Sequence, residues 1–159
     1  MNIWPAYQRQ MMTQQPVYST RFRGILLILT IILAQLFFPA VTRANSIAIS
    51  GYDTVAYFTM KKAMKGNKQY THLWNGKTWY FASIKHKDMF IANPEKYAPQ
   101  FNGFCANGLS DGHAVAADPE NWRIIDGKLY LFFSEYGRNQ WSGDVKPLIQ
   151  KARETLQDH

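Results

Sequence analysis

Residues 74–105 read WNGKTWYFASIKHKDMFIANPEKYAPQFNGFC and carry the clearest secondary-structure signals of the chain. Asn75 and Gly76 stand between two aromatic-rich runs, a pattern that predicts a two-residue β-hairpin turn. With these two residues in the turn, Trp74 pairs with Lys77 and His72 with Trp79. The predicted aromatic face of this hairpin carries Tyr70, His72, Trp74, Trp79 and Phe81.

A helix is expected directly after this hairpin. The Ser83 hydroxyl can accept an early backbone N–H, which favours a helix that begins at Ile84. Asn93 ends the helix and caps a further turn, in which Pro94 takes the first position. One predicted face of the helix carries His86, Met89 and Phe90.

A second hairpin is predicted around Asp126 and Gly127. In this register Ile124 pairs with Leu129 and Trp122 with Leu131, so these four side chains face the core. Ser134 caps a helix or turn, and a final helix follows Asp144. The apolar face of that last helix carries Leu148, Ile149, Ala152 and Leu156. The two hairpins give a weak hint of internal duplication.

Two remaining segments have weaker patterns. Residues 55–58 form a short apolar run, which predicts a buried strand or turn. Residues 101–113 contain three glycines at close spacing, which predicts an irregular loop. Together these signals predict an α+β fold: a small single domain with an antiparallel sheet from two β-hairpins and about three packed helices.

The N-terminal region has the pattern of a signal peptide. Arg21 and Arg23 precede an apolar run at 24–38, which is short for a membrane span but typical of a secretory h-region. Pro39 follows, and Ala44 provides a small residue for cleavage. We therefore predict a signal peptide at 1–44, a mature domain at 45–159, and a periplasmic or secreted protein with no stable membrane insertion after processing. The alternative is an uncleaved membrane anchor.

Removal of the signal peptide changes the charge of the protein. The whole chain of 159 residues has a formal net charge of +7, with 18 basic and 11 acidic residues. Residues 1–44 contain four arginines and no acidic residue, so the mature charge is 14 − 11 = +3. Much of the basic excess belongs to the export signal, and we therefore expect no nucleic-acid partner.

Cys105 is the single cysteine of the chain and cannot form an internal disulfide. It is either a small buried apolar residue or a thiol with a function. A thiolate and imidazoles suit Cu(I) or Zn²⁺, so one hypothesis is a metal site. Another is a thiol-dependent enzyme or redox protein that uses Cys105 with a nearby histidine. The candidate metal ligands are Cys105, His72, His86 and His113.

The chain resembles the exported bacterial branch of the YHS domain family. The resemblance is carried by 51–58 (GYDTVAYF), 74–76 (WNG), 80–83 (YFAS), 94–100 (PEKYAPQ), 103–106 (GFCA) and 126–131 (DGKLYL). These motifs keep their order and cover most of residues 48–155. In metal-associated members, two cysteines stand where this chain has Ala82 and His86, so their thiolate cluster is absent here.

The resemblance implies a non-enzymatic module that binds a small ligand or a metal ion, with copper or zinc as the candidate cofactors. The expected ligand-binding residues are Tyr52, Asp53, Trp74 and Tyr97, which all lie within the family-like motifs. The alternatives from other classes are the thiol-dependent enzyme or redox protein and a purely structural interaction module.

Overall fold

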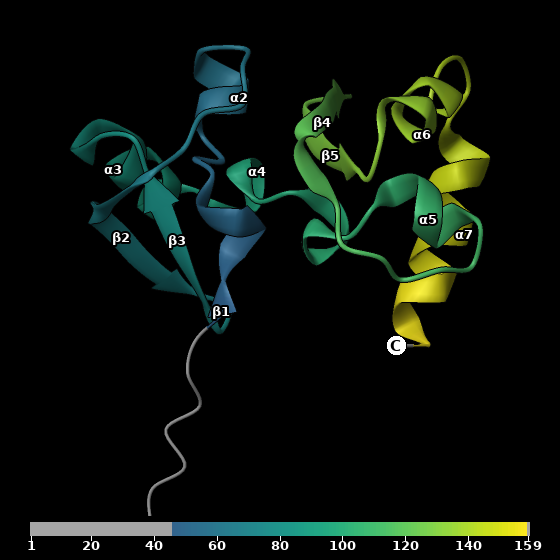
Figure 1. Cartoon of the computed structure of the whole chain (residues 1–159), viewed down its shortest axis with the longest axis horizontal. Coiled ribbons are helices and arrows are strands. Elements are labelled where there is room, and N and C mark those ends of the chain that lie inside the picture. Colours follow the sequence, from purple (N-terminus) through teal and green to yellow (C-terminus); the bar gives the residue numbers. More distant parts are fainter. Residues whose placement is uncertain (1–45, 159) are drawn as a thin grey trace, which may run out of the picture. The chain divides into compact units, whose positions relative to one another are not determined.

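Two β-hairpins organise the structure (Figure 1). The computed structural model describes residues 46–158, which belong to one unit, Ala44–His159. The first hairpin contains β2 (Asn67–Trp74) and β3 (Lys77–Phe81), and the second contains β4 (Asp118–Ile125) and β5 (Lys128–Phe132). His72 lies opposite Trp79 and Ile124 opposite Leu129, which confirms both predicted registers.

The turn residues explain why both hairpins form at these positions. Asn75 and Gly76 have φ values of 47° and 69°, and Asp126 and Gly127 have φ values of 49° and 73°. A two-residue turn with positive φ at both positions matches the twist of the flanking strands. Asn, Asp and Gly tolerate this backbone best, so the local sequence selects the turn.

The hairpins lie in two separate sheets. β1 (Ser46–Ile47) pairs in parallel with β3, which gives a three-stranded sheet of order β1-β3-β2, whereas β4 and β5 form a two-stranded sheet. A single parallel bridge between Pro99 and Leu129 extends the second sheet in the same way. The predicted α+β class is confirmed, but each hairpin packs against its own apolar cluster and they do not join in one continuous sheet.

Helices form at the four places where the sequence predicts a helix, a turn or either of the two. They are α3 (Ile84–Ala92), α4 (Pro94–Tyr97), α6 (Glu135–Gln140) and α7 (Lys146–Gln157). Ser83 accepts the N–H of His86 at 3.2 Å, and Ser134 accepts the N–H of Gly137 at 3.3 Å. Asn93 accepts the N–H of Lys96 at 3.2 Å. These side chains satisfy backbone donors that would otherwise lack partners.

Two short helices correct the sequence analysis. α2 (Ala56–Thr59) replaces the strand or turn expected at 55–58, and α5 (Ala106–Ser110) occupies part of the segment expected as a loop. Each has about one turn, so neither leaves a periodic apolar pattern. Near their starts, the Asp53 carboxylate accepts the N–H groups of Val55 and Ala56, and the Cys105 thiol accepts that of Gly108. With α2 and α5, the described residues contain six α-helices, compared with the three or so that the sequence predicts.

The core consists of three apolar clusters. One forms around the first hairpin and α3, and another around the second hairpin and α7. The third joins them, because Tyr57 of α2 packs on Leu129 and Leu131 of β5 and donates to the carbonyl of Pro119 at 3.0 Å. Trp122 and Ile124, expected in the core, are partly buried against this third cluster. The apolar face of α7 packs as predicted, with Leu148, Ile149, Ala152 and Leu156 in the second cluster.

The two halves of the domain repeat one structural pattern. We define the halves as residues 46–92 and 98–140. In each half a parallel pairing, by strand β1 in the first and by a single bridge at Pro99 in the second, leads into a 3-10 helix, a hairpin and a serine-capped helix. The 3-10 helices are η1 (Ala48–Gly51) and η2 (Gln100–Gly103), and each contains two residues with positive φ before its glycine. Both hairpins also shift register at the same place in their first strand. The weak hint of duplication in the sequence therefore corresponds to a repeat in the structure.

No helix in the described part of the chain is long and apolar enough to cross a membrane. The predicted signal peptide at 1–44 and its cleavage after Ala44 lie outside the described residues.

Candidate functional site

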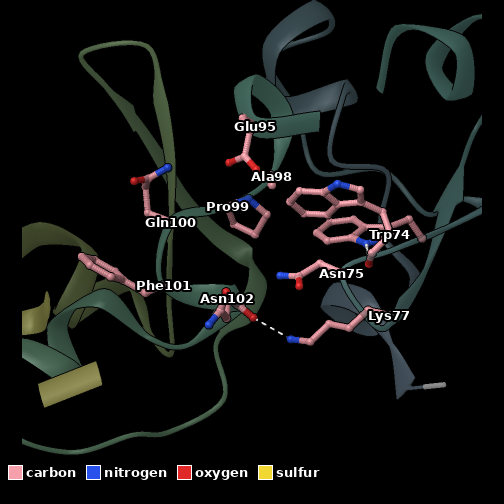
Figure 2. Close-up of a pocket in the computed structure, with 10 residues that line it drawn as sticks. Trp74, Asn75, Lys77, Glu95, Ala98, Pro99, Gln100, Phe101 and Asn102 are labelled. Atoms are coloured by element: carbon pink, nitrogen blue, oxygen red, sulfur yellow. Dashed lines mark hydrogen bonds between the residues drawn. The ribbon is translucent and has the colours of Figure 1, made fainter. Parts of the chain in front are cut away.

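A cavity of about 190 Å³ lies between the turn of the first hairpin and the segment that leads into the second half (Figure 2). One wall comes from β2, β3 and their turn, and the other from α4 and the residues up to η2. The lining residues are Trp74, Asn75, Lys77, Trp79, Glu95, Ala98, Pro99, Gln100, Phe101 and Asn102.

The aromatic wall is held in place by packing. The Trp74 ring is half-buried and lies edge-on to Phe90, with ring centroids 5.6 Å apart and an interplanar angle of 88°. Trp79 is buried below it, and its Nε1 donates to the Trp74 carbonyl at 3.1 Å. Since the backbone and the ring of Trp74 are both fixed, the indole is a preformed surface for a ligand.

The opposite wall depends on unusual backbone. Pro99 is buried, and Asn102 has a φ of 56° in η2. That conformation lets the Asn102 carbonyl accept a hydrogen bond from Lys77 Nζ at 2.9 Å, which closes one side of the cavity (Figure 2). Phe101 contributes little to the opening, because its ring points away toward Tyr130 and Trp141.

Five of the ten lining residues have polar side chains of different kinds: Asn75, Lys77, Glu95, Gln100 and Asn102. Asn75 is exposed and its carboxamide is directed toward the cavity (Figure 2). Glu95 supplies an exposed carboxylate and Lys77 an ammonium group on the far side. A carboxamide both donates and accepts, a carboxylate accepts, and an ammonium donates. The cavity therefore combines one aromatic surface with many hydrogen-bonding groups, and it is more polar than most sites for small apolar ligands.

Of the four residues expected to contact a ligand, Trp74 lines this cavity. Tyr97 is buried and packs edge-on to Phe58, and its carbonyl accepts a hydrogen bond from the Thr54 hydroxyl. Tyr52 donates from its phenol to Glu120 at 2.7 Å, and this hydrogen bond raises the pKa of Tyr52 to about 12. The Tyr52 phenol therefore stays protonated at neutral pH.

Asp53 is fully buried and forms the centre of a hydrogen-bond network. One carboxylate oxygen accepts the N–H groups of Val55 and Ala56 at 2.9 and 3.3 Å, and the other accepts the N–H of Ala82 at 2.8 Å. His86 Nδ1 lies 2.6 Å from the second oxygen. Because a carboxylate can only accept, His86 donates from Nδ1.

The other ring nitrogen of His86 reaches α2. Its Nε2 lies 3.2 Å from the Thr59 hydroxyl, which also lies 3.1 Å from the Val55 carbonyl. A carboxylate, an imidazole and a hydroxyl in sequence resemble a catalytic triad in order. Here, however, the hydroxyl bonds to its own helix, and the carboxylate also holds three backbone groups. The network joins α2, β3 and α3, which is a structural role.

Cys105 is buried, with 3% of its surface exposed, and packs among Phe101, Leu109 and Trp141. Its Sγ accepts the N–H groups of Gly108 and Phe133 at 3.2 and 3.1 Å. No imidazole is among the hydrogen-bond partners of the thiol in the described residues. Apolar packing with two backbone donors is the arrangement that favours the buried, structural alternative for this thiol.

The histidines named as candidate metal ligands have different surroundings. His72 packs edge-on to Phe90, with centroids 6.3 Å apart, His86 is bound to Asp53, and His113 is exposed. Between residues 46 and 158, no three His, Cys, Asp or Glu side chains form a group that could hold a metal ion. The metal site stays a prediction of the sequence analysis.

Sequence reasoning missed most of the cavity. The sequence predicts a turn at Asn75, a turn that begins at Pro94 and an irregular loop at 101–113, and none of these patterns indicates a cavity. A local signal could not identify them, because the cavity joins two segments that meet only in the tertiary structure. Comparison with protein-family models, curated proteins and solved structures found no match for this chain.

Proposed function

We propose that this chain is an exported, non-enzymatic domain that binds a small organic ligand in the cavity beside Trp74. The observation that carries the proposal is the combination of a fixed, half-buried indole with the Asn75 carboxamide and the Glu95 carboxylate around one cavity. Such a site can bind by stacking and hydrogen bonding without any chemical step.

Two observations favour a small organic ligand over a metal ion or thiol chemistry. Cys105 is buried and its sulfur already accepts two backbone N–H groups, whereas a reactive thiolate needs access to a substrate. His86 is already bound on both sides of its ring. The resemblance to YHS domains agrees with a binding module, and the pattern of residues 1–44 supports export.

The test is a binding screen with protein purified after expression of the full chain. Ligand-observed NMR with a set of neutral, cationic and anionic small molecules would identify binders. Trp74→Leu keeps an apolar contact with Phe90 but removes the flat ring, so we expect it to weaken binding about tenfold or more. If no compound in the set binds, or if binding is unchanged in Trp74→Leu, the proposal is wrong.

A further inference from the structure

We infer that the ligand is a neutral, hydroxyl-rich ring, such as one residue of a saccharide. This inference rests on the proposed function, since it names the chemical class that the cavity beside Trp74 would accept. Three properties of the cavity lead to it: its balance of charge, its apolar surfaces and the kind of polar groups at its edge.

The charges of the cavity do not favour a ligand that carries a net charge. Lys77 and Glu95 are its two charged lining residues, and their charges cancel. A cationic ligand would meet the Lys77 ammonium, and an anionic ligand would meet the Glu95 carboxylate. Because Glu95 is exposed and Lys77 is half-buried, water and salt screen both charges, so ion pairing would contribute little to affinity.

The apolar surfaces suit a ring with C–H faces. The Trp74 indole forms one side, and Figure 2 shows the Pro99 ring on the side that faces it. A pyranose has faces made of C–H groups and an edge of hydroxyl groups. Its face can therefore stack on the indole while its hydroxyls point away from the aromatic ring. The volume of about 190 Å³ lies below the ~300–1,000 Å³ of sites for drug-sized ligands, which suits one ring.

The polar groups match hydroxyls, which both donate and accept. The Asn75 carboxamide offers donors and an acceptor, and the Glu95 carboxylate offers acceptors. The Lys77 ammonium has three donors, of which the Asn102 carbonyl takes one. Because a hydroxyl both donates and accepts, it can form a hydrogen bond with each of these groups. A group that carries a single positive or negative charge can pair favourably with only some of them.

The experiment measures binding to protein purified after expression of the full chain. Calorimetry would use methyl β-glucoside, methyl β-galactoside, N-acetylglucosamine and cellobiose, with glycine, ethanolamine and benzoate as non-sugar comparators. The key variant is Asn75→Gly, because glycine keeps the positive φ of the turn and removes only the carboxamide. Its matched control is Asp126→Gly, the same change in the turn of the second hairpin, outside the cavity lining.

We expect at least one saccharide to bind, with affinity reduced about 2- to 10-fold in Asn75→Gly and unchanged in Asp126→Gly. Saccharide binding that is equal in both variants and in Trp74→Leu would overturn the inference. A comparator that binds in a Trp74-dependent way, while no saccharide does, would overturn the saccharide class and leave the proposed function standing. Absence of binding by every probe here and every compound of the wider screen would reject both.

Discussion

Asp53 and Cys105 occupy equivalent positions in the two halves of the domain. Each comes two residues after the glycine that ends a 3-10 helix, Gly51 in η1 and Gly103 in η2. Each side chain accepts N–H groups at the start of a short helix. Each also accepts the N–H of the residue after the second strand of its hairpin, Ala82 for Asp53 and Phe133 for Cys105. One backbone arrangement is therefore held together by a carboxylate in one half and by a thiol in the other.

The two halves differ at the helix that follows each hairpin. His86 donates its N–H to the Ser83 cap, and Gly137 donates to the Ser134 cap at the equivalent place. In the first half the side chain at this position, His86, reaches the buried acceptor Asp53. In the second half the position is a glycine, which has no side chain to reach Cys105. A Cβ at Gly137 would lie 3.3 Å from Asn107 Cβ, so the second half has little room for a larger residue. The comparison indicates that Cys105 serves as a buried hydrogen-bond acceptor, a role the sequence alone left open.

The largest effect is expected at Asp53. In Asp53→Asn, the amide N–H₂ would face donors that the carboxylate now accepts, either the Val55 and Ala56 N–H groups or the Ala82 N–H and His86 Nδ1. Each buried donor left without an acceptor costs about 1–3 kcal/mol, and Asn would leave at least one such donor while removing the carboxylate charge that the others now pair with. Chemical denaturation would measure the free energy of unfolding. A loss below about 1 kcal/mol would show that the network does not hold the first half together.

The next effect concerns a place where the halves carry different residues. An isolated antiparallel β-bridge pairs Tyr52 with Lys65 in the first half, and an equivalent bridge pairs Phe104 with Ala116 in the second. The residues that follow these bridges, Gly66 and Ala117, therefore occupy equivalent positions. A Cβ at Gly66 would lie 2.5 Å from the backbone carbon of Tyr80. Gly66→Ala should therefore cost about 1–3 kcal/mol through overpacking. The reciprocal Ala117→Gly should cost about 0.5–1 kcal/mol, and thermal denaturation would compare them; equal losses would contradict the difference in packing.

A smaller loss is expected for Cys105→Ser. The serine oxygen can accept the N–H groups of Gly108 and Phe133, but its hydroxyl would enter an apolar cluster. We expect a loss of about 1–2 kcal/mol in the free energy of unfolding. Equilibrium dialysis of the reduced protein against copper and zinc provides the second measurement. Stoichiometric metal binding that Cys105→Ser abolishes would support the metal hypothesis and contradict a purely structural thiol.

The smallest effect is expected at the turns. Asn75→Gly and Asp126→Gly should each change the free energy of unfolding by about 0.5 kcal/mol or less, because both positions have positive φ and are exposed. Heat denaturation of the two variants would measure this. Their stabilities should agree while their ligand affinities differ. A large loss at Asn75 alone would show that its carboxamide stabilises the fold as well as the cavity.

The local signals of the sequence determined the hairpins and the capped helices. Asn75-Gly76 and Asp126-Gly127 set the registers, and Ser83, Asn93 and Ser134 set the helix starts. These features depend on backbone conformations and short-range hydrogen bonds, which a few neighbouring residues control. They did not reveal α2 and α5, because helices of about one turn leave no periodic apolar pattern.

Tertiary structure alone decided the buried network and the cavity. Ala82 and His86 meet Asp53 because β3 of the first hairpin packs on η1. Lys77 meets the carbonyl of Asn102 because two positive-φ residues turn the backbone of η2 toward it. Such contacts join residues separated by many positions, and their energy arises only when the apolar clusters bring the segments together. For this reason the sequence determined the elements, and the packing determined which side chains share a site.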